Sequence, residues 1–164
     1  MVARSLVAAA ALWVALILFA PLAIASGRGT FSLGGAGIYA AGARVCHQRP
    51  DRCFWIHGRP MPVCARCTGL YAGAALAGPL ALFLASAVSS RRARLTAALA
   101  ALPTLISWSL EFAGLAHPSN SVRAMAALPL GFVVAWLVIS VGHPTSDARR
   151  PTPDDRRPTS GRLV

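Results

Sequence analysis

Long apolar stretches separated by short polar segments set the pattern of the chain. Four stretches carry no charge except Glu111, near the end of the third, and they cover 5–25, 68–90, 95–116 and 124–142. Each is close to the roughly 20 residues that a membrane-spanning helix needs. The pattern therefore predicts an all-α integral membrane protein with about four transmembrane helices, at about 5–25, 67–88, 95–115 and 123–142.

The four predicted helices form a single polytopic membrane domain, residues 1–142, followed by a basic Pro/Arg tail. Residues 143–164 are rich in Pro, Ser, Thr and charge, a composition that predicts disorder. Residues 27–43 are rich in Gly and only weakly apolar. They are too short for another span and fit an interfacial or re-entrant segment, provided that protein covers its backbone.

The first apolar stretch has two interpretations. Arg4 is a minimal positive region, and Ala23-Ile24-Ala25 before Ser26 resembles the cleavage site of a signal peptide. The stretch is longer than the apolar part of a usual signal peptide, which favours a retained helix. The choice alters the number of helices but not the side of the membrane on which the cysteines lie.

The overall composition supports the membrane assignment. Hydrophobic residues make up 55% of the chain and charged residues 13%, about half the charged fraction of a typical soluble domain. The net charge is +11, and all 16 basic residues are Arg. Because these arginines lie in loops and in the tail, we attribute them to membrane topology and expect a lipid bilayer as partner, not nucleic acid. No particular protein partner is indicated.

The distribution of arginine predicts the orientation in the membrane. With four helices, one face carries nine arginines, in the N-terminus, the 89–94 connector and the tail, and the other face carries seven. Short cytoplasmic loops are enriched in basic residues. We therefore predict a multi-pass protein of the cell (inner or plasma) membrane, with both termini cytoplasmic and the cysteine loop facing outward.

The loop between the first and second predicted helices holds all four cysteines and two of the four histidines: Cys46, His47, Cys53, His57, Cys64 and Cys67. Thiolates and imidazoles suit zinc, iron and copper, and a Cys-x-x-Cys turn brings two sulfurs close enough to share one ion. We therefore predict a transition-metal site, zinc first, with Cys64 and Cys67 as the leading ligands. Cys46 and His47 follow as ligands, and Cys53 and His57 are further candidates.

Two other uses of the cysteines fit the same sequence. A helix that begins at Cys64-x-x-Cys67 places its positive end and free N–H groups beside the sulfurs, and Arg66 adds to this effect. Such surroundings favour the thiolate, which serves redox chemistry as well as metal binding. An outward-facing loop also permits inert structural disulfides.

A second polar cluster is predicted to meet the first. An acid at membrane depth is costly and indicates function, and Glu111 is such an acid, with Asn120 and Arg123 following within twelve residues. In an up-and-down topology this loop shares a membrane face with the cysteine loop. We predict that Arg66, Glu111, Asn120 and Arg123 form a supporting polar shell; the simpler alternative is a structural ion pair between Glu111 and Arg123.

Three blocks of the chain, "CHQRPDRCF", "PVCARCTGLYAG" and "HPSNSVRAMAALPLGF", resemble the predicted membrane-protein family called domain of unknown function 2085. The matching residues are Cys46, His47, Gln48, Pro50, Arg52, Phe54, Cys64 to Gly69, Tyr71, Gly73, Ser119, Asn120, Arg123 and Gly131. The resemblance covers about residues 43–141. It implies a shared set of Cys46, His47, Cys64 and Cys67. The late acid looks like Asp in the family and is Glu111 here, and Cys53 stands where Ser is expected, which implies that Cys53 is dispensable.

The leading functional hypothesis is a membrane protein with a Cys/His metal site at one membrane face; the sequence does not favour an enzyme over a binding protein. The first alternative is a thiol–disulfide oxidoreductase with a layout similar to DsbB-like and vitamin K epoxide reductase-like enzymes. In it, Cys46 and Cys53 would pass electrons to Cys64 and Cys67 and then to a quinone. The second alternative is a structural membrane subunit with a stapled loop.

Overall fold

The computed structural model describes residues 2–84 and 89–141, and this part of the chain is mostly helical. Its five helices are α1 (Val2–Ala25), α2 (Gly29–Ala43), α3 (Ala65–Leu84), α4 (Ser90–Phe112) and α5 (Asn120–Val141). Between α2 and α3 lie a single 3-10 turn, η1 (Pro50–Arg52), and a small antiparallel hairpin of β1 (Trp55–Ile56) and β2 (Arg59–Pro60). The helical prediction is confirmed, while the predicted disordered tail falls outside the described residues.

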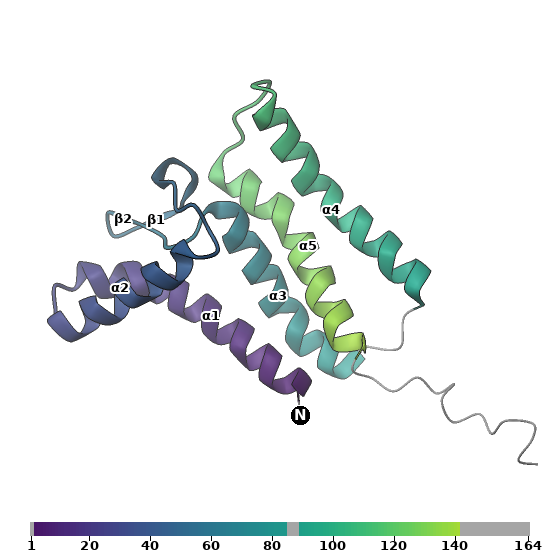
Figure 1. Ribbon diagram of the computed structural model, residues 1–164, viewed down its shortest axis with the longest axis horizontal. Coiled ribbons are helices and arrows are strands. Elements are labelled where there is room, and N and C mark those ends of the chain that lie inside the picture. Colours follow the sequence, from purple (N-terminus) through teal and green to yellow (C-terminus); the bar gives the residue numbers. More distant parts are fainter. Residues whose placement is uncertain (1, 85–88, 142–164) are drawn as a thin grey trace, which may run out of the picture.

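Four helices lie side by side in the order α1, α3, α5 and α4, and α2 folds back against α1 (Figure 1). The N-terminal ends of α3 and α5 and the C-terminal end of α4 share one end of this layer. The loop between α2 and α3 and the loop between α4 and α5 therefore meet at that end. This arrangement is the convergence that the up-and-down topology predicted.

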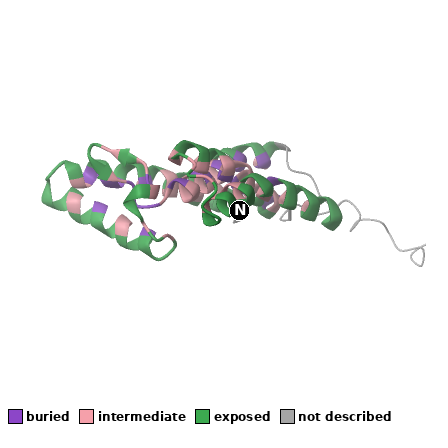
Figure 2. Cartoon of the chain, turned by 90° about the horizontal axis from the view of Figure 1, so that it is seen from above, coloured by how far each residue is buried: buried purple, intermediate pink, exposed green. Residues whose placement is uncertain are grey.

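Much of the length of the helices is exposed (Figure 2), and the exposed residues include many large hydrophobic side chains. Among the described residues, three helices are long and apolar enough to cross a membrane, over Ala3–Ala25, Ser90–Phe112 and Asn120–Ser140. On α4, large side chains such as Leu99, Leu105 and Trp108 are at least half exposed. A water-soluble protein rarely shows so extended an apolar surface, whereas lipid covers it in a membrane protein.

Helix α2 forms where the sequence predicted an interfacial or re-entrant segment, and its helical structure was not predicted. Gly35 of α2 packs directly on α1, where a Cβ atom would lie 3.0 Å from the carbonyl oxygen of Ala20 and 3.3 Å from the Ala23 side chain. Gly disfavours a helix in isolation. Here the absence of a side chain lets two backbones approach, and this packing outweighs the weak intrinsic preference.

The bounds of α4 also differ from the predicted 95–115. The helix begins at Ser90, so that Arg91, Arg92 and Arg94 belong to its first turns and not to a separate connector. Arg is a good helix former, and its apolar stem packs along a helix while its charge reaches water. The helix ends at Phe112 because Gly114 adopts a φ of +69°.

The end of α4 is a Schellman motif that fixes the last turn. The Gly114 N–H donates to the Glu111 carbonyl at 3.1 Å, and the Leu115 N–H donates to the Leu110 carbonyl at 2.9 Å. These bonds satisfy carbonyls that a helix end would otherwise leave free. Glu111 is thereby held in the final turn of α4, next to the loop that leads to α5.

Helices α3 and α5 make the closest contact in the fold. A Cβ atom on Gly69 would collide with the Ala124 carbonyl, one on Gly73 with the Leu128 carbonyl, and one on Gly131 with the Leu70 backbone. Small residues of this kind allow membrane helices to pack backbone to backbone. Gly69 and Gly73 stand at i and i+4 on the face of α3 that meets α5, and Gly131 contributes the matching close contact from α5.

Replacing Gly73 by Ala is expected to separate α3 from α5 and to lower the free energy of unfolding by about 1–3 kcal/mol, the usual cost of overpacking. The measurement is titration with sodium dodecyl sulfate in mixed micelles. Gly37→Ala is the matched control, because Gly37 lies within helix α2 and has open space around it. Equal losses in the two variants would show that the close contact is unimportant.

Candidate metal centre

Cys64 and Cys67 lie at the N-terminal end of α3. Cys64 immediately precedes the helix, and its carbonyl accepts the Thr68 N–H at 2.9 Å, the first bond of the helical pattern. Cys67 follows within the first turn. The N–H groups at a helix start have no partner inside the helix and favour negative charge nearby. The predicted position of the Cys-x-x-Cys motif at a helix start is therefore what the structure shows.

Cys46 is brought to this helix start by the end of α2. Its N–H donates to the Gly42 carbonyl at 2.9 Å. The Gln48 side chain donates to the Tyr39 carbonyl at 2.7 Å and to the Pro62 carbonyl at 2.8 Å. These two bonds tie the end of α2 to the segment that enters α3. Gln48 thus holds the segment that carries Cys46 beside the segment that carries Cys64.

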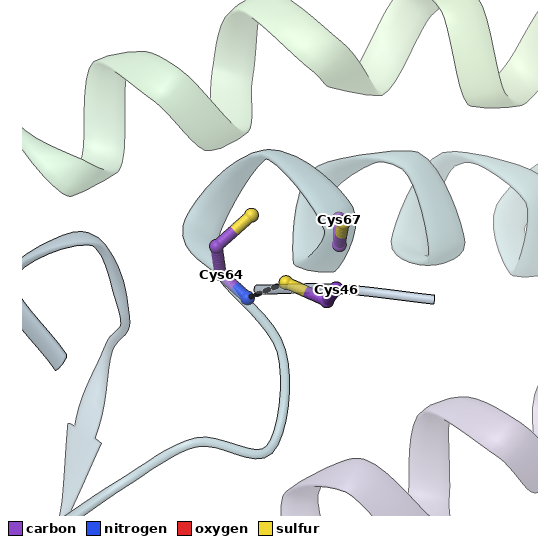
Figure 3. A group of neighbouring side chains, drawn as sticks. All are labelled: Cys46, Cys64 and Cys67. Carbon is purple, nitrogen blue, oxygen red and sulfur yellow. Dashed lines mark hydrogen bonds between the residues drawn. The ribbon is translucent and has the colours of Figure 1, made fainter. Parts of the chain in front are cut away.

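The three cysteines form one compact group, with the sulfurs of Cys46, Cys64 and Cys67 all within 4.8 Å of one another. The Cys64 N–H donates to the Cys46 sulfur at 3.1 Å (Figure 3). Sulfurs around a tetrahedral zinc ion, with Zn–S of about 2.3 Å, stand roughly 3.8 Å apart. The group therefore needs only a small contraction to hold such an ion.

Hydrogen bonding favours the thiolate form of Cys64. Bonds from the Cys67 side chain and from the backbone N–H groups of Cys67 and Arg66 lower the pKa of Cys64 to about 5, although burial acts in the opposite direction. A metal ligand or a nucleophile must be deprotonated. Cys64 is therefore prepared for either role at neutral pH.

The other predicted ligands lie outside this group. His47 is exposed and lines the cavity beside the cysteines. Cys53 is fully buried, and burial raises its pKa to about 11. His57 is exposed in the tight turn between β1 and β2, with a φ of +48°. Of the six candidates, the structure gathers Cys46, Cys64 and Cys67.

Glu111 is the centre of a second cluster that adjoins the first. Its side chain is only 7% exposed, and three arginines contact its carboxylate. Arg66 Nη2 lies 2.7 Å from Oε2, Arg123 Nη2 lies 2.9 Å from Oε1, and Arg52 Nη2 lies 3.1 Å from Oε1. The Glu111–Arg123 pair was predicted; here it is part of a four-residue cluster.

Asn120 connects the second cluster to the cysteine loop. Its Nδ2 donates to the Cys53 carbonyl at 2.9 Å, and its Oδ1 accepts the Arg123 Nη1–H at 2.7 Å. Residues from the α2–α3 loop, α3, α4 and α5 are thereby joined through side chains. The predicted shell of Arg66, Glu111, Asn120 and Arg123 comes together in space, at the same end of the molecule as the cysteines.

A cavity of about 300 Å³ opens beside the cysteine group. Cys46, Cys64 and Cys67 line one part of it, and Arg49, Arg52, Arg66 and Arg123 line another. Glu111 does not line it. The cysteines thus face a space with a strongly basic wall, large enough for a small polar ligand.

Sequence reasoning missed three polar residues of this site: Gln48, Arg49 and Arg52. All three look like ordinary polar loop residues, and none is a typical metal ligand. The signal that marks them is their position in the "CHQRPDR" block, which also contains Cys46. Polar residues so close to a candidate ligand are themselves candidates for positioning it or for lining its cavity.

A family model described as "Predicted membrane protein (DUF2085)" matches residues 46–137 of the chain. This range is more than half of the sequence and contains both polar clusters. The chain belongs to this family. The match confirms the resemblance seen in the sequence blocks, and it places the three cysteines and the Glu111 cluster inside the DUF2085 region, whereas α1 and α2 lie before it.

Two archaeal proteins are similar to the chain. One, from Methanothermobacter thermautotrophicus, is 34% identical over 99 residues, which cover 60% of this chain and 88% of that protein. The other, from Methanocaldococcus jannaschii, is 28% identical over 105 residues, 63% of this chain and 67% of that protein. Both carry the name "Uncharacterized protein". No solved structure matches the chain.

Replacing Glu111 by Gln is expected to destabilise the fold strongly, because three guanidinium groups then lose their buried counter-charge. Breaking a buried ion pair from one side typically costs about 3–5 kcal/mol. Asp51→Asn is the matched control, since Asp51 is 60% exposed and pairs with the equally exposed Arg49. Exposed ion pairs contribute about 0–1 kcal/mol to stability. Detergent unfolding curves of the two variants give the comparison, and similar midpoints would contradict a central role for Glu111.

Proposed function

We propose that this protein is a four-span cell-membrane protein that binds one transition-metal ion, best matched by zinc, through Cys46, Cys64 and Cys67. The observation that carries the proposal is the grouping of three sulfurs within 4.8 Å of one another at a helix start. Thiolates are soft ligands that suit zinc. The low pKa of Cys64, about 5, supplies one of them without a proton to remove at neutral pH.

The coordination sphere leaves one position for a ligand other than these cysteines. Zinc takes four ligands, and sites with three protein ligands keep the fourth position for water or a substrate. The cavity on the cysteine group gives access to that position, and His47 lines the same cavity. A bound ion would polarise whatever occupies the fourth position. It would also fasten the end of α2, through Cys46, to the start of α3.

The topology forms part of the proposal. In addition to the three helices that are long and apolar enough, we propose that α3 spans the bilayer, because it packs along α5 through Gly69 and Gly73. We also propose that α1 is retained, since Ile17 of α1 packs with Met61 and Val63 in the core beneath the cysteine group. The cysteine end would face outward, and the N-terminus and the start of α4 would face the cytoplasm.

A thiol–disulfide oxidoreductase that uses a quinone is the second candidate. The proximity of Cys64 and Cys67 and the low pKa of Cys64 support it. A relay from a Cys46–Cys53 pair has less support, because Cys46 stands with the Cys64–Cys67 pair while Cys53 lies outside that group. The third candidate, a structural subunit, requires only that the ion staple the loop to the bundle.

Elemental analysis of protein purified in detergent under reducing conditions tests the metal site. We expect about one zinc ion per chain, lost in Cys46→Ser, Cys64→Ser and Cys67→Ser because each removes one of three thiolate ligands. Cys53→Ser is the control that should retain the ion, since Cys53 is buried away from the group. Metal-free protein in which a Cys64–Cys67 disulfide forms once the reductant is removed would instead support the oxidoreductase.

Labelling with a membrane-impermeant maleimide tests the orientation. His57→Cys, at the exposed tip of the hairpin, is expected to react in intact cells. Ser89→Cys, exposed at the opposite end of the bundle, is expected to react only after permeabilisation. Peptide mass spectrometry separates these sites from the native cysteines. The reverse pattern would place the cysteine group in the cytoplasm and leave the metal proposal unchanged.

A further inference from the structure

The cavity beside the cysteine group carries more positive charge than the protein balances. Four arginines line it: Arg49, Arg52, Arg66 and Arg123. In the part of the chain that the structure describes, the only acids are Asp51 and Glu111, and both pair with these same arginines. Arginine does not deprotonate in proteins. Four guanidinium cations against two carboxylates therefore leave an excess of two positive charges among these side chains, and the Cys64 thiolate offsets one of them.

Water has limited access to part of this charge. The side chains of Arg66 and Arg123 are only 14% and 11% exposed, whereas that of Arg52 is 36% exposed. Removing a cation from water is costly unless an anion compensates it. Glu111 compensates one of the three arginines that contact it. The three arginines line the cavity and Glu111 does not, so the remaining positive charge faces the cavity.

The arginines also have hydrogen-bonding capacity left over. The Nε atoms of Arg52 and Arg66 are buried and have no hydrogen-bond partner among residues 2–84 and 89–141. Arg52 Nε lies 3.8 Å from Oδ2 of Asp51, which is beyond hydrogen-bond distance. A buried donor without an acceptor costs free energy. An oxyanion in the cavity supplies the missing negative charge beside these guanidinium groups.

We propose that this cavity binds a phosphate monoester group, held by Arg52, Arg66 and Arg123. A phosphate monoester carries about −1.5 to −2 charge at pH 7 and can pair with several guanidinium groups at once. Its oxygens match the planar donor fork of guanidinium, which binds phosphate in a bidentate manner. The cavity volume of about 300 Å³ accommodates the phosphate together with the first atoms of the group that it esterifies.

The phosphate site does not rest on the proposed metal site. Three thiolates on a divalent ion contribute one net negative charge, which still leaves the cavity positive. The phosphate monoester has two sources at a membrane face, a soluble metabolite or the headgroup of a lipid. Both present the same chemistry to the arginines, and the experiment separates them.

The test uses the reduced full-length protein in nanodiscs of neutral lipid. Calorimetric titration with phenyl phosphate probes soluble monoesters. Native mass spectrometry of nanodiscs that also contain phosphatidic acid probes the lipid headgroup, with phosphatidylcholine as the reference. Binding of phenyl phosphate indicates the soluble source, and selective retention of phosphatidic acid indicates the lipid source. Absence of both would overturn the proposal.

Arg52→Gln is the informative variant, because it leaves Glu111 paired with two arginines and so preserves the fold. It is expected to weaken binding roughly tenfold or more, since a charge-assisted contact is lost. Arg52→Lys keeps the charge without the fork and is expected to bind at an intermediate level. Arg59→Gln is the matched control, because Arg59 is exposed on β2 and does not line the cavity.

Two further outcomes would contradict the proposal. Equal weakening by Arg52→Gln and Arg59→Gln would indicate a diffuse effect of positive charge. Loss of phosphate binding after treatment with a metal chelator would mean that an ion, and not the arginines, holds the anion. Retention of binding in chelator-treated protein and in Cys64→Ser supports the arginine site, whatever the outcome of the metal analysis.

Discussion

A single buried carboxylate holds the functional end of this protein together. Glu111 stands in the last turn of α4 and contacts arginines from the η1 turn, from the first turn of α3 and from the first turn of α5. The glycine contacts already join α3 to α5, and Glu111 adds α4 and the η1 turn to the same end of the bundle. Because each guanidinium needs a counter-charge once it is buried, the position of Glu111 determines where the other three segments can lie.

The cysteine group depends on this constraint through Arg66. Arg66 lies between Cys64 and Cys67 in the sequence and points to Glu111, while the two sulfurs lie close to Cys46. One helical turn thus presents sulfur to the loop and positive charge to the bundle. A shift of Arg66 is transmitted to the sulfurs, because Arg66 and both cysteines belong to the same four-residue segment of backbone, Cys64 to Cys67. The cysteine group and the arginine-lined cavity are therefore adjoining parts of one structure.

The long elements and the convergence of the two loops followed from the sequence, and the local packing did not. The apolar stretches fixed the helices to within a few residues, since the membrane thickness sets their length. The meeting of Glu111 with the cysteine face followed from alternating helix directions. Helix α2 was missed because its Gly-rich composition argues against a helix, and its contact with α1 is a tertiary effect that no local pattern records. Arg52 was missed for a similar reason, since its partner lies 59 residues away in the sequence and on another helix.

The close fit between α3 and α5 has a consequence for the synthesis of the protein. Helix α3 carries Gly69 and Gly73 on the face that meets α5, and that face fits only a closely packed helix. Its partner leaves the ribosome only after α4 has been made. The final packing of α3 therefore waits for α5, so that the order in which the helices are made differs from the order in which they pack.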